Sequence, residues 1–234
     1  MTFEKGDFIL IDYVGRIKET NEVFDTTMEE VAKEHGIYRE GAIYEPKLVA
    51  VGEGWILKAL EEKLLEFEVG EERVVEIPPE KAYGHRDPSK IRLIPLKRLL
   101  EKGITPRIGM RVEYNGRIAI VRTVGSGRVQ LDFNHPLAGK TLVYKVKVVK
   151  KLEEREEKIL ALIHRRIPIV EVEKFKIEIE DGNLTVVVPE EAFYIDGIQV
   201  AKRGIANDIM KFFQEINSVC FIERFERKTS EQQP

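Results

Sequence analysis

The chain has 234 residues, of which 43% are hydrophobic and 34% are charged. Its 38 basic and 41 acidic residues give a formal net charge of -3, so no bulk positive field favours nucleic acid or an anionic membrane as a partner. The length exceeds one typical domain, and we expect two or three compact units.

No apolar run approaches the roughly 18 residues that a transmembrane helix needs, and the first residues, MTFEKGDF, lack a secretory signal. The single cysteine, Cys220, lies in the apolar run VCFI, where we expect it to be a small buried side chain in a reducing compartment. A soluble cytoplasmic protein is therefore expected.

The first region is predicted to be rich in strands. Residues 6–17 and the segment NEVFDTT read as strands, and residues 28–47 as an irregular excursion with one helical turn. Residues 48–84 then predict strand, glycine turn, helix, turn and strand. Since Ile56, Leu60 and Leu64 recur every four residues, they share one helix face. We predict a half-barrel of antiparallel strands around this short helix.

A separate module is predicted over residues 88–132. It contains the strand IRLIP, a helix opened by Pro95 and ended by Gly103, a hairpin around Asn115 and Gly116, and the strand RVQLDF. The alternating run LVYKVKVVKKL follows it and again predicts a strand. The simplest topology inserts 88–132 into a discontinuous first domain made of residues 1–87 and 133–151.

Residues 152–226 predict a third, α+β domain with the order helix, strand, strand, helix, strand. Leu152, Ile159 and Ile163 would share a face of its first helix. The second helix is predicted between residues 200 and 216, with Ile205, Ile209, Phe212 and Ile216 on one side. We expect the tail, residues 227–234, to be disordered.

Few chemical motifs are present. The chain has no Walker phosphate loop and no nucleophile elbow, and its four histidines lie too far apart to suggest ligand spacing, so we expect neither metal nor cofactor. Asp25 stands out among the carboxylates because it follows Phe24 at a strand end, although a capping or turn role is as compatible with the pattern. Aromatic residues from separated segments could converge on the concave side of the half-barrel, but spacing alone favours core positions, which are the usual ones for scattered aromatic residues in strands. They are Tyr13, Phe24, Trp55, Tyr83 and Tyr144.

A set of motifs in fixed order carries a family resemblance: FILIDYVG, VFDTT, a helix ending at EVGE, IPPEKAYG and NHPLAGKTLVYKVKVV. In this order they resemble the FKBP family of peptidyl-prolyl cis-trans isomerases. NHPLAG after a domain-sized insertion resembles the SlyD-like branch, whose insert-in-flap domain is a chaperone. The additional C-terminal module is similar to that of the long-chain archaeal FKBPs.

The resemblance implies a peptidyl-prolyl isomerase acting on unfolded or proline-containing polypeptides. It implies Tyr83 as a hydrogen-bond donor to substrate and Asp25 in an electrostatic or water-ordering role. The implied substrate-binding residues are Tyr13, Phe24, Ile56, Leu57, Leu60, Leu137, Ala138 and Tyr144. Leu60 stands where drug-binding members carry Trp, so tight macrolide binding does not follow from the resemblance.

The resemblance further implies that the insert holds unfolded segments and that the C-terminal domain forms a homodimer. A contact of the C-terminal domain with nucleic acid is the less favoured interpretation, because acidic residues interrupt its basic clusters. A passive chaperone without isomerase activity is the alternative function. The tail ERKTSEQQP lacks the His and Cys residues with which SlyD members bind nickel, so we expect no nickel binding.

Overall fold

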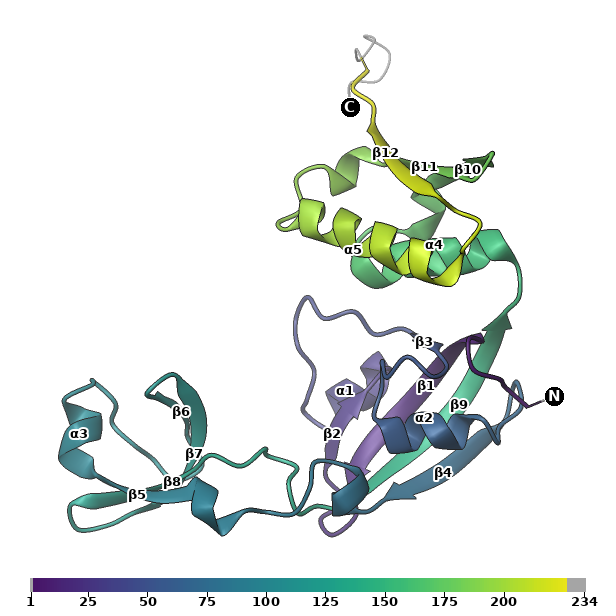
Figure 1. Cartoon of the computed structure of the whole chain (residues 1–234). Helices are drawn as coiled ribbons and strands as arrows, with labels where there is room; N and C mark the ends of the chain where they lie inside the picture. Colours follow the sequence, from purple (N-terminus) through teal and green to yellow (C-terminus); the bar gives the residue numbers. More distant parts are fainter. Residues whose placement is uncertain (1, 227–234) are drawn as a thin grey trace.

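A computed structural model describes residues 2–226 of the chain, and the predicted disordered tail lies outside this range. The chain forms three units, of which the second is inserted into the sequence of the first (Figure 1). The half-barrel lies between the other two units (Figure 1). The insert projects from one end of the half-barrel, and the C-terminal domain covers its other end (Figure 1). None of the helices among the described residues has the length and hydropathy that a membrane span requires.

The half-barrel is a five-stranded antiparallel sheet with the order β2-β1-β9-β4, and β3 also pairs with β1. Its strands are β1 (Phe8–Ile17), β2 (Val23–Thr26), β3 (Lys47–Ala50), β4 (Glu72–Ile77) and β9 (Leu142–Leu152). The helix α2 (Lys58–Leu64) buries Leu60 and Leu64 against the sheet, as the four-residue spacing predicts. Ile56 was expected on the same helix face but precedes the helix, which begins after Leu57, and it is only partly buried. The short helix α1 (Glu29–Glu34) is the predicted helical turn of the excursion.

Long-range strand pairing joins the two halves of this domain. The register of β1 with β9 runs from Phe8 opposite Leu152 to Ile17 opposite Leu142. Residues separated by more than half of the chain therefore share a ladder, and the polypeptide between β4 and β9 leaves the sheet and returns to it. Two 3₁₀ turns, η1 (Pro79–Lys81) and η2 (Pro88–Lys90), lie on the outgoing path.

The insert is a four-stranded antiparallel sheet, order β5-β8-β7-β6, packed on a short helix. It contains β5 (Ile91–Pro95), α3 (Leu96–Leu100), β6 (Arg111–Tyr114), β7 (Arg117–Val124) and β8 (Arg128–Asp132). The hairpin prediction is confirmed: Asn115 and Gly116 have φ of 52° and 71°, the left-handed values that a type I′ turn requires. A separate core around Leu99, Val121 and Leu131 fills this unit.

The C-terminal domain has the predicted element order, with a three-stranded sheet β10-β11-β12 on two helices. Its elements are α4 (Arg155–Arg166), η3 (Val172–Lys174), β10 (Lys176–Glu180), β11 (Asn183–Val188), η4 (Glu190–Ala192), α5 (Ile198–Phe212) and β12 (Ser218–Glu223). Strands β10 and β11 form a hairpin, whereas β11 and β12 are parallel and are connected through α5.

Three expectations for this region were wrong. Leu152 is the last residue of β9 rather than part of α4, because its pairing with Phe8 extends the β1–β9 ladder. Ile216 lies beyond α5, in the turn that leads to β12, although its side chain is buried. Cys220 is exposed, because β12 alternates and its inward positions are Val219 and Phe221.

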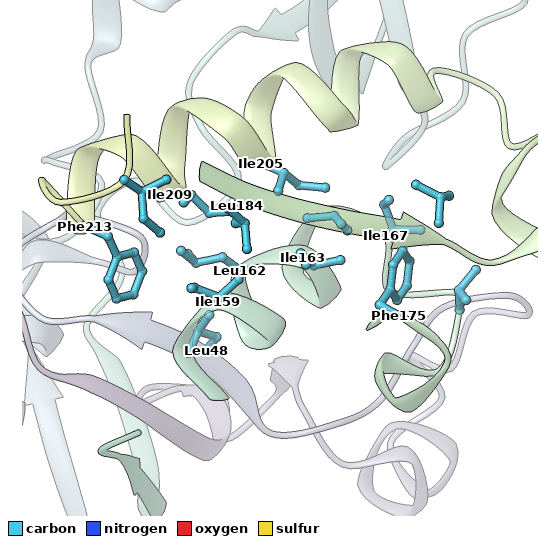
Figure 2. Close-up of a cluster of buried hydrophobic side chains, with 14 of the residues drawn as sticks. Leu48, Ile159, Leu162, Ile163, Ile167, Phe175, Leu184, Ile205, Ile209 and Phe213 are labelled. Atoms are coloured by element: carbon cyan, nitrogen blue, oxygen red, sulfur yellow. The ribbon is translucent and has the colours of Figure 1, made fainter. Parts of the chain in front are cut away.

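The C-terminal domain and the half-barrel share one hydrophobic core. Phe8, Leu48 and Leu152 of the sheet belong to the same buried cluster as Ile159 and Leu162 of α4. Figure 2 shows Leu48 beside Ile159 and Leu162, below the side chains of β11 and α5. The contact between the two domains is therefore continuous apolar packing.

Candidate active site

A cavity of about 260 Å³ opens between the sheet, the segment before α2 and the loop after β4. Its lining consists of Tyr13, Asp25, Lys47, Trp55, Ile56, Leu57, Leu60, Tyr83 and Tyr144. All of these were predicted site residues except Lys47 and Trp55, and Trp55 was among the aromatic residues expected to converge. Six separated segments of the half-barrel thus meet at one cavity.

Aromatic rings form one side of the site. The ring of Tyr144 packs edge-on against Tyr13, with centroids 5.9 Å apart, and against Phe24, with centroids 5.7 Å apart. Gly15 makes this packing possible, since a Cβ at that position would lie 2.8 Å from the Phe24 ring and 3.1 Å from the Tyr144 ring. Phe24 itself lines a neighbouring hollow rather than the cavity.

Tyr13 fixes the position of the Asp25 carboxylate. Its hydroxyl donates a hydrogen bond of 2.7 Å to Asp25 Oδ2. Burial raises the pKa of Tyr13, and the bond to Asp25 raises it further, so the phenol remains a donor across the neutral range. Burial also raises the pKa of Tyr144. The site therefore presents one carboxylate beside two protonated phenols.

Tyr83 stands at the mouth of the cavity with 41% of its surface exposed. The imidazole of His135 stacks on its ring, with centroids 3.9 Å apart and planes 7° apart. Partial burial lowers the pKa of His135, which favours the neutral ring at physiological pH. Its Nδ1 accepts a hydrogen bond of 3.2 Å from the Leu137 amide.

The NHPLAG loop, residues 134–139, is bonded to the segment that carries Tyr83. Leu137 packs against the half-barrel core, and Ala138 is buried; neither is among the residues that line the cavity. The Gly139 amide donates to the Gly84 carbonyl at 2.8 Å, which ties the loop to the residue after Tyr83. The apolar residues of the loop thus anchor the segment that carries His135.

A buried carboxylate orders the segment before α2. Glu61 is 6% exposed and accepts bonds of 3.1 and 3.2 Å from the Gly54 amide. This holds the turn that presents Trp55 and Ile56 to the cavity. Sequence reasoning missed Glu61 and Lys47, because each lies at an ordinary position in a charged chain.

Two further hollows adjoin the cavity at Asp25. One, of about 450 Å³, follows the loop of residues 36–44, and the other, of about 340 Å³, is closed by α4.

Several basic residues of the C-terminal domain make intramolecular contacts with carboxylates. His164 Nε2 lies 2.9 Å from Glu45, Arg166 pairs with Asp208 at 2.8 Å, and Lys202 pairs with Glu223.

Comparison with known proteins identifies each part of the chain. The family model described as "FKBP26, IF domain" matches residues 92–137, and the model described as "FKBP26_C-terminal" matches residues 155–226.

Relatives extend the match over the half-barrel. A short-type peptidyl-prolyl cis-trans isomerase of Methanocaldococcus jannaschii is 42% identical over 145 residues, covering 62% of this chain and 91% of the relative. The FKBP-type isomerase SlyD of Helicobacter pylori is 31% identical over 66% of this chain and 78% of its own length. SlyD of Treponema pallidum is 34% identical over 49% of this chain and 66% of its own. The chain therefore belongs to the FKBP-type peptidyl-prolyl cis-trans isomerases, with a SlyD-like half-barrel, an inserted domain and a C-terminal domain.

Proposed function

We propose that the chain catalyses cis-trans isomerisation of X-Pro bonds in the cavity between Tyr13, Leu60, Tyr83 and Tyr144. The observation that carries this proposal is the convergence of apolar and aromatic side chains around a carboxylate that is already held by a phenol. No nucleophile or general base is required, because the reaction is a rotation rather than a bond cleavage.

The physical basis is desolvation of the amide. Resonance gives the C–N bond a rotational barrier of about 18–20 kcal/mol. Water strengthens that resonance by donating to the carbonyl oxygen, and an apolar cavity removes this water. The twisted amide, with reduced charge separation, then binds better than the planar one, which lowers the barrier. Tyr83 donates from the cavity mouth to the substrate backbone, and Asp25 supplies a fixed negative charge beside the rotating bond.

Proline-limited refolding of a model protein tests this function. X-Pro steps take tens to hundreds of seconds at 25 °C, so they are resolved easily. The wild-type chain should accelerate this phase, Tyr83→Ala should abolish most of the acceleration, and Tyr83→Phe should isolate the share of the hydroxyl. Unchanged acceleration by Tyr83→Ala would refute the assignment of the site. Suppressed aggregation without acceleration by wild type would instead indicate the passive chaperone.

The inserted domain is proposed to hold unfolded segments. One face of its sheet packs on Leu99, and strand alternation directs Leu93 of β5 and Ile118 of β7 to the opposite face. These two side chains are 59% and 53% exposed. An apolar surface of this kind raises the local concentration of a client near the cavity.

A double variant, Leu93→Ser with Ile118→Ser, tests this role. Turnover of a short proline peptide should be unchanged, and acceleration of protein refolding should fall about tenfold, because only the protein substrate gains from a second attachment. The matched control is Val74→Ser on the half-barrel, whose side chain is 67% exposed. Equal loss on peptide and protein would show that the insert only supports the fold.

Homodimerisation through the C-terminal domain is also proposed. Exposed apolar side chains gather there, including Tyr194, Val200 and Phe225. Strand β12 is the last strand of its sheet among the described residues, so its outer edge can pair with another strand. Light scattering over a concentration series should show a dimer, and Val200→Asp should shift the equilibrium to monomer. A monomeric wild-type chain at all concentrations would refute the dimer.

A further inference from the structure

The hollow closed by α4 is built from two domains. It measures about 340 Å³ and is lined on one side by the half-barrel and on the other by α4 and the residues after it. The C-terminal contributors are Ala161, His164, Arg165 and Pro168. Tyr13, Asp25 and Lys47 line both this hollow and the aromatic cavity, so the two spaces adjoin along these three residues.

The wall supplied by α4 is held firmly. His164 Nε2 lies 2.9 Å from both carboxylate oxygens of Glu45, in the loop before β3. The guanidinium of Arg165 lies over the Trp55 ring, 3.8 Å from its centroid. Since Trp55 lines the aromatic cavity, α4 contacts a wall residue of that cavity directly.

The carboxylates that line this hollow are better paired than its cations. Both carboxylates have partners, because Asp25 accepts from Tyr13 and Glu45 contacts His164. The cations are less well paired. Lys47 has no carboxylate within 4.0 Å among residues 2–226. Arg165 reaches only Asp208, at 3.5 Å, and that carboxylate is already bound by Arg166 at 2.8 Å.

We propose that this hollow is a specificity subsite, in which Lys47 and Arg165 bind an acidic side chain close to the substrate proline. The proposal rests on the proposed isomerase function, because it places the proline in the aromatic cavity. An extended chain spans about 3.3–3.6 Å per residue, so an acidic residue within about three positions of the proline reaches the adjoining space. The C-terminal domain thus contributes directly to substrate choice.

The test uses three families of peptides that carry Glu, Gln or Lys at each of three positions on either side of one proline. At one of these positions we expect kcat/KM in the order Glu, Gln, Lys, with Glu over Lys by about three- to tenfold at low salt and less at 0.5 M salt. Lys47→Gln should bring the Glu to Lys ratio close to one. The ratio is the readout, because Lys47 also lines the aromatic cavity and its replacement affects turnover of all the peptides. Lys147→Gln is the matched control, since Lys147 is exposed on β9 and lines neither space.

Several outcomes of this peptide assay would overturn the subsite. A Glu to Lys ratio near one at every position, or a ratio that Lys47→Gln leaves unchanged, would overturn the subsite. A preference for Lys would assign the selection to Asp25 and Glu45 and would also overturn it. If no peptide were turned over, the proposed function would fail separately. The subsite would then be tested by peptide binding, read from the fluorescence of Trp55, the single tryptophan of the chain.

Discussion

The hydrogen bond between Tyr13 and Asp25 predicts that substitutions at these two residues have non-additive effects on catalysis. A bond to a charged group contributes about 1.5–3 kcal/mol. Asp25 is exposed, so water replaces the lost phenol in Tyr13→Phe, and the net cost falls below that range, to about 0.5–1 kcal/mol. If the carboxylate acts on the rotating amide and Tyr13 only holds it, Asp25→Asn should lower kcat/KM about tenfold. Tyr13→Phe should lower it about threefold, because the carboxylate remains but is no longer fixed.

The double variant, Tyr13→Phe with Asp25→Asn, distinguishes a positioning role of Tyr13 from two independent roles of the two residues. We expect it to resemble Asp25→Asn alone, with a coupling energy of about 0.5–1 kcal/mol. The assay is a protease-coupled measurement on one proline peptide at neutral pH, where Tyr13 is protonated because its pKa is raised by burial and by Asp25. Additive losses in the double variant, or full activity of Asp25→Asn, would refute the positioning role of Tyr13.

Further perturbations test the packing and the electrostatics. Gly15→Ala should displace the Phe24 ring, costing about 1 kcal/mol of stability because the clash is with the end of a side chain, and lowering peptide turnover several-fold; unchanged turnover would contradict this. Asp7→Asn should lower the free energy of unfolding at pH 7 by about 0.5–1 kcal/mol through loss of the 2.8 Å pair with Lys151. Burial alone would raise the pKa of Asp7, but the Glu4 amide and Lys151 lower it below 3.8. The gap between wild type and Asp7→Asn should therefore persist above about pH 4 and close as pH falls through the folded-state pKa, as urea unfolding would show.

Local signals in the sequence predicted most of the fold. Alternation in LVYKVKVVKKL gives β9, the four-residue spacing of Leu60 and Leu64 gives α2, and Asn115 followed by Gly116 gives the hairpin. These signals depend on periodicity and on backbone preferences of single residues, which act over a few positions. The insertion of residues 88–132 into a discontinuous first domain was predicted, but the pairing of β1 with β9 was not, because a ladder between residues so far apart leaves no local signal.

Contacts between domains could not be predicted in this way. Trp55 was expected to join the aromatic site, yet it also packs edge-on against Phe212 of α5 at 5.9 Å and beneath Arg165. The role proposed for Lys47 depends on there being no carboxylate within 4.0 Å of it in residues 2–226, which is a property of the folded surface. Cys220 was misplaced because the apolar run VCFI does not reveal which of its residues face inward on an alternating strand.

The two added domains are attached by different physical means. The insert has its own core, and a polar cluster spans its two linkers: Asn134 exchanges bonds of 2.9 and 3.0 Å with the Asp87 backbone, and buried Asp132 binds Arg86 and Arg122. The C-terminal domain instead shares apolar core with the sheet and touches residues of the cavity. The insert contributes no residue to the cavity lining, whereas the shared core places α4 beside Lys47. A perturbation of the C-terminal domain should therefore reach the active site, and one within the insert should not.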